Sequence, residues 1–237
     1  MRKGRDTERE KERKAGDSAK QFVSAFPGMN NGKVRSIHKR GTVLFTEGQP
    51  ASGVYVIRSG RAKLSISSAQ GQVLILRVVQ EGQLIGVNSV LNGFPSEFTA
   101  ETLERCQTEF IPSADFVAMQ TLSKHFNEFV MRELGSEVSD LIEKSRMILL
   151  SQTAAEKLAR LLLLWCDESG VGEACDVAVH NRFTHEEVAQ MICSSRETVT
   201  RLLSEFSKRR LIRLTGNTIL IRDRAALEGF TKRRKLH

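Results

Sequence analysis

The chain has 237 residues, a formal net charge of +8 at pH 7 and an isoelectric point near 9.6. This length accommodates two small domains with separate hydrophobic cores, and the basic charge favours a polyanionic partner without setting sequence specificity. No apolar run reaches the length of a membrane span. No two cysteines form a CxxC pair, which zinc and iron–sulfur sites commonly use; the four are Cys106, Cys166, Cys175 and Cys193. We therefore expect neither a membrane segment nor a bound metal.

Both ends of the chain are rich in charge. Residues 1–30 begin with interleaved charges of both signs and no hydrophobic period, which predicts a disordered tail or a frayed polar helix. Because this N-terminus lacks an apolar core it is not a signal peptide, and we expect a cytoplasmic protein. The run Lys232–Lys235 is basic throughout, so it is expected to be solvated or to touch a nucleic-acid backbone.

From Gly41 to Pro112, short runs of β-forming residues alternate with turns that contain glycine. This spacing of strands and turns predicts an antiparallel sandwich or barrel. The residues expected to fill its interior are Tyr55, Ile57, Leu64, Leu74, Leu76 and Val78.

A long helix is predicted from Ser123 to about residue 151. Apolar or small side chains recur on it at alternating spacings of three and four, a heptad pattern typical of a helix with a partner helix. They are Met131, Leu134, Val138, Leu141, Ser145 and Ile148. Two interpretations stay open: the helix packs on its own β domain, or it pairs with a second subunit. One helix can do both with different faces.

The last third of the chain mixes helices and short strands. A leucine-rich helix is predicted from Thr153 to about Trp165, followed by a strand at residues 177–182. Two alternating strands flank the turn Thr215–Asn217 and predict a β-hairpin.

Residues 184–203 predict two short helices joined by a tight turn. Thr184 and Glu187 form a capping box at the start of the first helix. Ser195 can cap the second helix, with Thr198 at the third helical position. The apolar side chains expected to face inward are Val188, Met191, Ile192, Val199, Leu202 and Leu203.

The outer face of the second helix carries Arg196, Glu197 and Thr200, with Arg201 one turn beyond Glu197. A helix in the DNA major groove presents its first turns to base edges, where Arg suits the two acceptors of guanine and Glu accepts from the amine of cytosine. The alternative is a surface hairpin with solvated charges. The grouping of Arg, Glu and Arg with hydroxyls around the turn favours DNA reading.

The stretch SSRETVTRLL, residues 194–203, closely resembles the recognition helix of the Crp/Fnr transcription regulators. The resemblance implies that Arg196, Glu197 and Arg201 read bases. The residues that fall where the family contacts phosphates are Thr184, His185, Ser195, Thr198 and Thr200. Cys193 stands where the family often has Gly, so this position is expected to carry backbone strain.

The resemblance covers roughly residues 41–230 and implies an α+β fold. It divides the chain into the charged tail at 1–30, a double-stranded β-roll sensor domain at 31–122, a dimerisation helix at 123–151 and a winged helix-turn-helix DNA-binding domain at 152–237. The roll resembles a cyclic-nucleotide-binding domain. By resemblance, the protein is a homodimer that reads an inverted repeat in double-stranded DNA and contacts RNA polymerase.

The expected effector pocket differs from that of the nucleotide-binding members of the family. Seven residues fall at pocket positions: Gly82, Gly86, Val87, Glu97, Phe98, Ile142 and Glu143. Val87 replaces a ribose-binding Glu, Glu97 and Phe98 replace the phosphate-binding Arg and Ser, and the last two residues replace adenine-contacting hydroxyls. A cyclic phosphate needs positive charge and a fork of donors, whereas Glu97 offers negative charge. We expect no tight binding of cyclic AMP.

The residues that other members of the family use to sense oxygen or to bind haem are largely missing from this sequence. Residues 1–105 contain no Cys, which excludes an N-terminal oxygen-sensing cysteine cluster, and a haem on the roll or long helix would have to use His38 or His125. An unknown small ligand, redox chemistry at Cys106 and the absence of any effector stay open. We expect no cofactor.

Two other functions fit the sequence less well. A ligand-binding regulatory module that acts on a protein partner would not need the Arg-Glu-Arg face. An enzyme acting on nucleic acid would need clustered carboxylates for a metal, or a nucleophile beside a base, and the acidic residues are scattered. The sequence therefore predicts a DNA-binding regulator that is not an enzyme.

Overall fold

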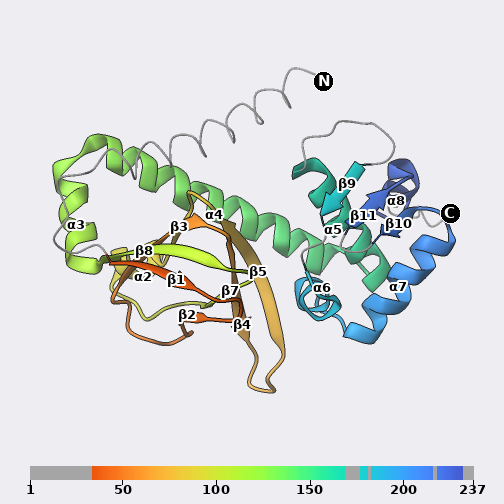
Figure 1. The fold of residues 1–237 in the computed structure, drawn as a ribbon, viewed down its shortest axis with the longest axis horizontal. Helices are drawn as coiled ribbons and strands as arrows, with labels where there is room; N and C mark the ends of the chain where they lie inside the picture. Colours follow the sequence, from red (N-terminus) through yellow and green to blue (C-terminus); the bar gives the residue numbers. More distant parts are fainter. Residues whose placement is uncertain (1–33, 169–176, 181–182, 216–217, 232–237) are drawn as a thin grey trace. The chain divides into compact units, whose positions relative to one another are not determined.

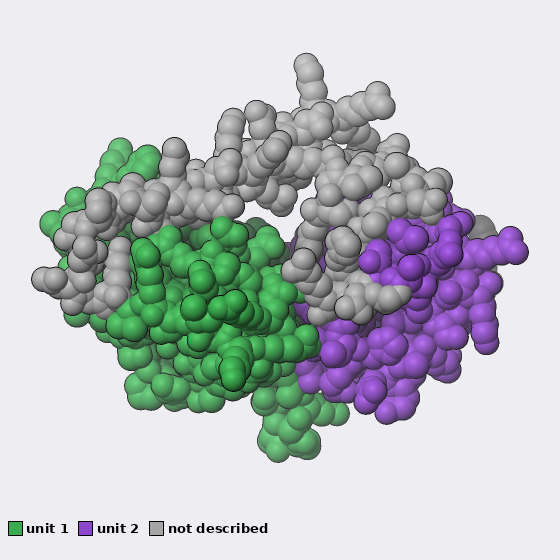
Figure 2. Space-filling model, in the orientation of Figure 1, with its two compact units in different colours: residues 1–141 green, residues 142–237 purple. Residues whose placement is uncertain are grey.

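The computed structural model describes residues 34–168, 177–180, 183–215 and 218–231 (Figure 1). The chain divides into two compact units, residues 1–141 and residues 142–237, which are described separately (Figure 2). The predicted tail at 1–30, the basic run Lys232–Lys235 and the turn residues Gly216 and Asn217 lie outside the described residues. None of the described helices is long and apolar enough to cross a membrane.

Two four-stranded antiparallel sheets form the body of the first unit. One sheet has the order β1-β8-β3-β6 and the other the order β2-β7-β4-β5. The strands are β1 Val34–His38, β2 Val43–Phe45, β3 Gly53–Ser59, β4 Arg61–Ser67, β5 Val73–Gln80, β6 Leu84–Ile85, β7 Thr99–Thr102 and β8 Cys106–Pro112. The predicted antiparallel sandwich is confirmed.

The sequence prediction of the roll interior was wrong along β5. Ile57 and Leu64 are buried as predicted, but Leu74, Leu76 and Val78 are only half-buried, while Ile75, Arg77 and Val79 are fully buried. The run VLILRVV is apolar on both faces, so its alternation does not identify the inner one. The register with β4 also shifts beside Leu64, which changes the facing side chains along the strand.

Three helices cover the outer side of β3 and β6. They are α2 Val87–Asn92, α3 Ser113–Leu122 and α4 Lys124–Leu150. The side chain of Ser123 accepts a hydrogen bond from the backbone nitrogen of Phe126 at 3.2 Å, in agreement with a long helix that starts there. The apolar cluster under these helices includes Val54, Val56, Leu84, Val87, Phe116 and Phe126.

The long helix α4 has two apolar faces. Leu134 packs against the cluster just described, and Leu141 and Ile148 are half-buried. A second stripe is between 48% and 78% exposed and lies within about 40° around the helix axis. Its members are Met131, Val138, Ile142 and Leu149. The predicted heptad residues therefore divide between a face that packs within the subunit and a face that is open.

The second unit is a helical domain with a small antiparallel sheet. Its elements are α5 Ala154–Glu168, β9 Val177–His180, α6 His185–Ile192, α7 Arg196–Lys208, β10 Ile212–Thr215, β11 Thr218–Ile221 and α8 Arg224–Thr231, and the sheet has the order β10-β11-β9. The predicted hairpin is confirmed as β10 and β11. The largest buried side chains are Leu158, Leu162, Ile192, Leu203 and Phe206. They hold α5, α6 and α7 around one core.

Candidate nucleic-acid interface

The helix α6 begins with the predicted capping box. Thr184 Oγ1 accepts a hydrogen bond from the backbone nitrogen of Glu187 at 3.1 Å, and Glu187 Oε2 accepts from the backbone nitrogen of Thr184 at 2.6 Å. Two of the free N–H groups at the helix start are thereby satisfied. The inward-facing side chains predicted on α6 are buried: Val188, Met191 and Ile192. The opposite side of the helix therefore faces away from the core.

The turn after α6 is strained at the predicted position. Cys193 adopts the left-handed conformation with φ 51° and ψ 57°, which a residue with a Cβ rarely occupies. Its backbone nitrogen and that of Ser194 both donate to the carbonyl of Ala189. Two residues later, Ser195 Oγ accepts from the backbone nitrogen of Thr198 at 3.2 Å and caps α7, as predicted.

The helix α7 is sharply two-sided. Val199, Leu202, Leu203 and Phe206 are buried on one side. The other side presents four exposed polar side chains: Arg196, Glu197, Thr200 and Arg201. Three of these are the residues that the sequence predicts as base readers. The structure therefore brings them together on one open face, in the first two turns of the helix.

Glu197 is held in its ionised form. Hydrogen bonds from its own backbone nitrogen and from the Ser195 hydroxyl lower the pKa of its carboxyl group, and the guanidinium of Arg196 adds to this effect. A carboxylate in this form offers only acceptors. The N-terminal turn of α7 thus presents a guanidinium and an acceptor group side by side.

Thr200 and His185, two of the residues predicted at phosphate positions, link the two helices. Thr200 Oγ1 donates to the carbonyl of Arg196 at 2.9 Å and lies 2.8 Å from Nδ1 of His185. Because the hydroxyl proton is used on the carbonyl, His185 Nδ1 carries the proton of the second bond. This contact fixes the first residue of α6 against α7 on the exposed side.

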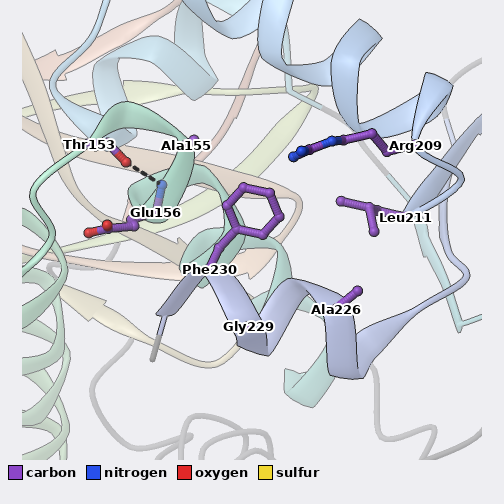
Figure 3. A pocket seen from close by; sticks show the side chains of 8 residues that line it. All are labelled: Thr153, Ala155, Glu156, Arg209, Leu211, Ala226, Gly229 and Phe230. Atoms are coloured by element: carbon purple, nitrogen blue, oxygen red, sulfur yellow. Dashed lines mark hydrogen bonds between the residues drawn. The ribbon is translucent and has the colours of Figure 1, made fainter. Parts of the chain in front are cut away.

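A separate cavity of about 840 Å³ lies at the other end of α7 (Figure 3). The ring of Phe230 and the side chain of Leu211 line it, and the guanidinium carbon of Arg209 lies over the ring, 5.6 Å from its centroid. Since α7 rises about 1.5 Å per residue, Arg209 is roughly 20 Å along the helix from Arg196. The cavity is therefore distinct from the Arg-Glu-Arg face.

The predicted pocket positions on the roll hold residues with other tasks. Val87 is buried in the core under the helices, and Phe98 is half-buried against the core between the sheets. Glu97 is exposed and accepts a hydrogen bond from Asn88 Nδ2 at 2.6 Å. Gly82 donates its backbone N–H to Ile57, and Gly86 precedes α2. The predicted positions on α4, Ile142 and Glu143, belong to the second unit, where Glu143 pairs with Arg146 at 2.7 Å.

The charged group in this region was not predicted from the sequence. Arg77 on β5 is 5% exposed, and its Nε lies 2.7 Å from Oδ2 of Asp140 on α4. Burial raises the pKa of Glu133, Glu137 and Asp140, and the charge of Arg77 partly offsets this rise. The sequence signal that could have revealed this buried charge is the single Arg within the apolar run VLILRVV.

Comparison with known families agrees with this geometry. Residues 36–121 match the family model of the cyclic nucleotide-binding domain, and residues 156–230 match that of the Crp-like helix-turn-helix domain. The chain belongs to the Crp/Fnr family. Members of the Crp/Fnr family are DNA-binding transcription regulators and not enzymes, so this chain is a DNA-binding transcription regulator.

Several Crp/Fnr relatives are similar over most of the chain. The CRP-like cAMP-activated global transcriptional regulator of Mycobacterium tuberculosis is 27% identical over 191 residues, which are 78% of this chain and 82% of that protein. The global nitrogen regulator of a Nostoc species is 27% identical over 207 residues, 85% of this chain and 92% of that protein.

Two solved structures share the fold of this chain. FixK2 from Bradyrhizobium japonicum has a TM-score of 0.73 at 16% identity, over 85% of this chain and 98% of that one. A CooA mutant from Carboxydothermus hydrogenoformans has a TM-score of 0.71 at 18% identity, over 84% and 88%. These similarities are to the architecture of a roll, a long helix and a helix-turn-helix.

Proposed function

We propose that this protein binds an inverted repeat in double-stranded DNA as a homodimer and reads bases with the N-terminal half of α7. The observation that carries the proposal is the exposed face of Arg196, Glu197 and Arg201, on a capped helix with a buried opposite side. Arg196 suits guanine and Glu197 suits the amine of cytosine. Thr184, His185, Ser195, Thr198 and Thr200 surround this face and are proposed to contact phosphates.

The open stripe on α4 supports the homodimer. Met131, Val138, Ile142 and Leu149 offer a continuous apolar strip to a second copy of the same helix. A parallel pair of long helices would set two α7 helices about 34 Å apart, one turn of DNA, which is the spacing that an inverted repeat requires. From such a site, the dimer acts on transcription by contacting RNA polymerase or by blocking it.

The region around Arg77 supports an effector other than cyclic AMP. Glu133, Glu137 and Asp140 interact electrostatically with Arg77, and Glu97 interacts with Glu137, so acidic groups outnumber the one guanidinium. A cyclic phosphate placed here would meet net negative charge. Two relatives of equal identity are named for different signals, cyclic AMP and nitrogen, so relatedness does not favour the nucleotide.

Isothermal calorimetry with cyclic AMP is therefore expected to show no binding of micromolar or tighter affinity. The Glu137→Gln variant removes one negative charge from the region and is the matched comparison. If the wild-type protein binds cyclic AMP with a micromolar or tighter dissociation constant, the proposal that cyclic AMP is not the effector is wrong.

Substitutions on α7 separate base reading from contact with the DNA backbone. Arg196→Ala is expected to weaken binding to the preferred site by about 1–3 kcal/mol and to relax the preference at one base pair. Glu197→Ala should change discrimination at a C·G pair more than it changes total affinity. The measurement is a binding-site selection with each variant.

Arg209→Ala is the matched control, because it removes the same charge from the other end of α7. It should leave the selected sequence unchanged. Wild-type preferences in both the Arg196 and the Glu197 variants would contradict the proposed reading face.

A further inference from the structure

One lysine of the long helix contacts the helix-turn-helix directly. Lys144 lies in the last third of α4, within the second unit, and its Nζ donates to the backbone carbonyl of Met191 at 2.5 Å. Met191 is in the last turn of α6. One helix turn farther along α4, Met147 is buried. The end of α4 is thus attached to the end of α6 by a hydrogen bond.

This hydrogen bond satisfies a group that the helix itself leaves open. The last four carbonyls of an α-helix have no intrahelical donor, and the negative end of the helix dipole lies there. At the end of α6, the carbonyl of Ala189 receives the backbone nitrogens of Cys193 and Ser194. The carbonyl of Met191 receives Lys144 instead. The ammonium of Lys144, on another helix, therefore caps the C-terminal end of α6. The left-handed turn at Cys193 follows directly and leads into α7.

Among the residues that the structure describes, the charge of Lys144 has few other partners nearby. Cys193 faces it from the turn between α6 and α7. On α4, the neighbouring Glu143 and Arg146 pair with each other, and the two acidic residues of α6, Glu186 and Glu187, lie in the first turn at its opposite end. Burial lowers the pKa of Lys144 to about 8, and the thiol of Cys193 partly offsets this. The ammonium is accordingly sensitive to pH in a range where other lysines stay charged.

We propose that Lys144 is a positioning residue for DNA reading, because its ammonium fixes the C-terminal end of α6 and the following turn to the long helix α4. The inference rests on the proposed reading face of α7. The turn at Cys193–Ser195 sets where Arg196 and Glu197 begin, so loosening it would move both base readers together.

Three substitutions test this role. Lys144→Met keeps the length of the side chain and removes the charge, Lys144→Arg keeps the charge through pH 9, and Lys124→Met removes the same charge from an exposed position of α4. Amide hydrogen exchange at Cys193 and Ser194 is measured on the free protein, and affinity for a selected DNA site is measured at pH 7 and pH 9.

We expect Lys144→Met to exchange faster at both amides and to bind the site roughly tenfold more weakly, as for loss of one charge-assisted hydrogen bond. Wild type should lose affinity from pH 7 to pH 9, because the protonated fraction of Lys144 falls from about nine tenths to about one tenth. Lys144→Arg should stay level over this range. Lys124→Met should behave like wild type.

A loss of folded protein at high pH cannot explain the expected fall in DNA affinity between pH 7 and pH 9. The pKa of Lys144 is lowered in the folded protein, so the unfolded chain binds more protons between about pH 8 and 10.5. The contribution of Lys144 to stability therefore rises with pH while the affinity for DNA falls. Equal pH slopes for wild type and Lys144→Arg would overturn the proposal, as would unchanged exchange at the turn in Lys144→Met.

If Lys144→Met does not fold, the comparison of Lys144→Arg with wild type over the pH series still tests whether Lys144 positions the reading helix. If the wild type selects no DNA sequence, the proposed function fails, whereas the exchange measurement on the free protein still tests the contact itself.

Discussion

Replacing Glu109 with Ala is expected to lower the free energy of unfolding of the β-roll by about 3 kcal/mol. The Glu109 side chain is 1% exposed, and its Oε2 accepts from Nη2 of Arg58 at 2.6 Å and from Nε at 3.0 Å. Arg35 adds a longer contact at 3.3 Å. Removal of the carboxylate takes away both of these hydrogen bonds from the Arg58 guanidinium to Glu109. The expected value lies at the low end for buried pairs because Arg58 is 24% exposed and can reach some water.

Glu128→Ala is the matched control for this substitution. Glu128 is an exposed acid on α4 whose 3.8 Å contact to His125 is open to solvent, so its loss should cost at most about 0.5 kcal/mol. Urea unfolding is followed by circular dichroism, while the single tryptophan, Trp165, reports the second unit separately. Equal stability of the two variants would show that the Glu109 pair does not hold the roll together.

Gly60→Ala should cost the roll about 3 kcal/mol as well. Gly60 alone joins β3 to β4, with φ +82°. A Cβ at this position would lie 2.5 Å from the carbonyl oxygen of Arg105 and 3.0 Å from the Cα of Cys106. Both are backbone atoms, so the strand itself would have to move. The left-handed conformation adds about 1–2 kcal/mol to this overpacking cost.

Gly71→Ala separates the two contributions. Gly71 has φ +79°, and a Cβ there would meet no atom within 4 Å, so only the conformational cost of about 1–2 kcal/mol remains. The difference in unfolding free energy between the two variants measures the clash with residues 105 and 106. If both substitutions cost the same, the close approach at Gly60 does not limit the turn.

The helix-turn-helix could be predicted in detail because its signals are local. The cap residues Thr184 and Ser195 lie within three residues of the N–H groups that they satisfy, and the buried side chains of α7 repeat at helical spacing. The left-handed turn at Cys193 was expected from resemblance alone. Once both helices were placed, the exposed position of Arg196, Glu197 and Arg201 followed.

The residues that the sequence did not reveal depend on partners far along the chain. The buried Arg77 pairs with Asp140, and the half-buried Lys144 donates to the carbonyl of Met191. Neither partner can be recognised from spacing, because a lysine on an amphipathic helix is ordinarily solvated. The inner face of β5 was mispredicted for a related reason, since a strand that is apolar on both sides takes its orientation from the register with β4.

The most direct test of DNA reading by α7 is a binding-site selection on randomised duplex DNA with the purified, ligand-free protein. We expect recovery of an inverted repeat whose half-sites are separated by about 10 base pairs, one turn of the helix. Such a site would establish a dimer that reads sequence without an added effector. Recovery of DNA with no shared motif, bound only in a salt-sensitive manner, would contradict this and show that the ligand-free dimer does not hold its recognition helices in register.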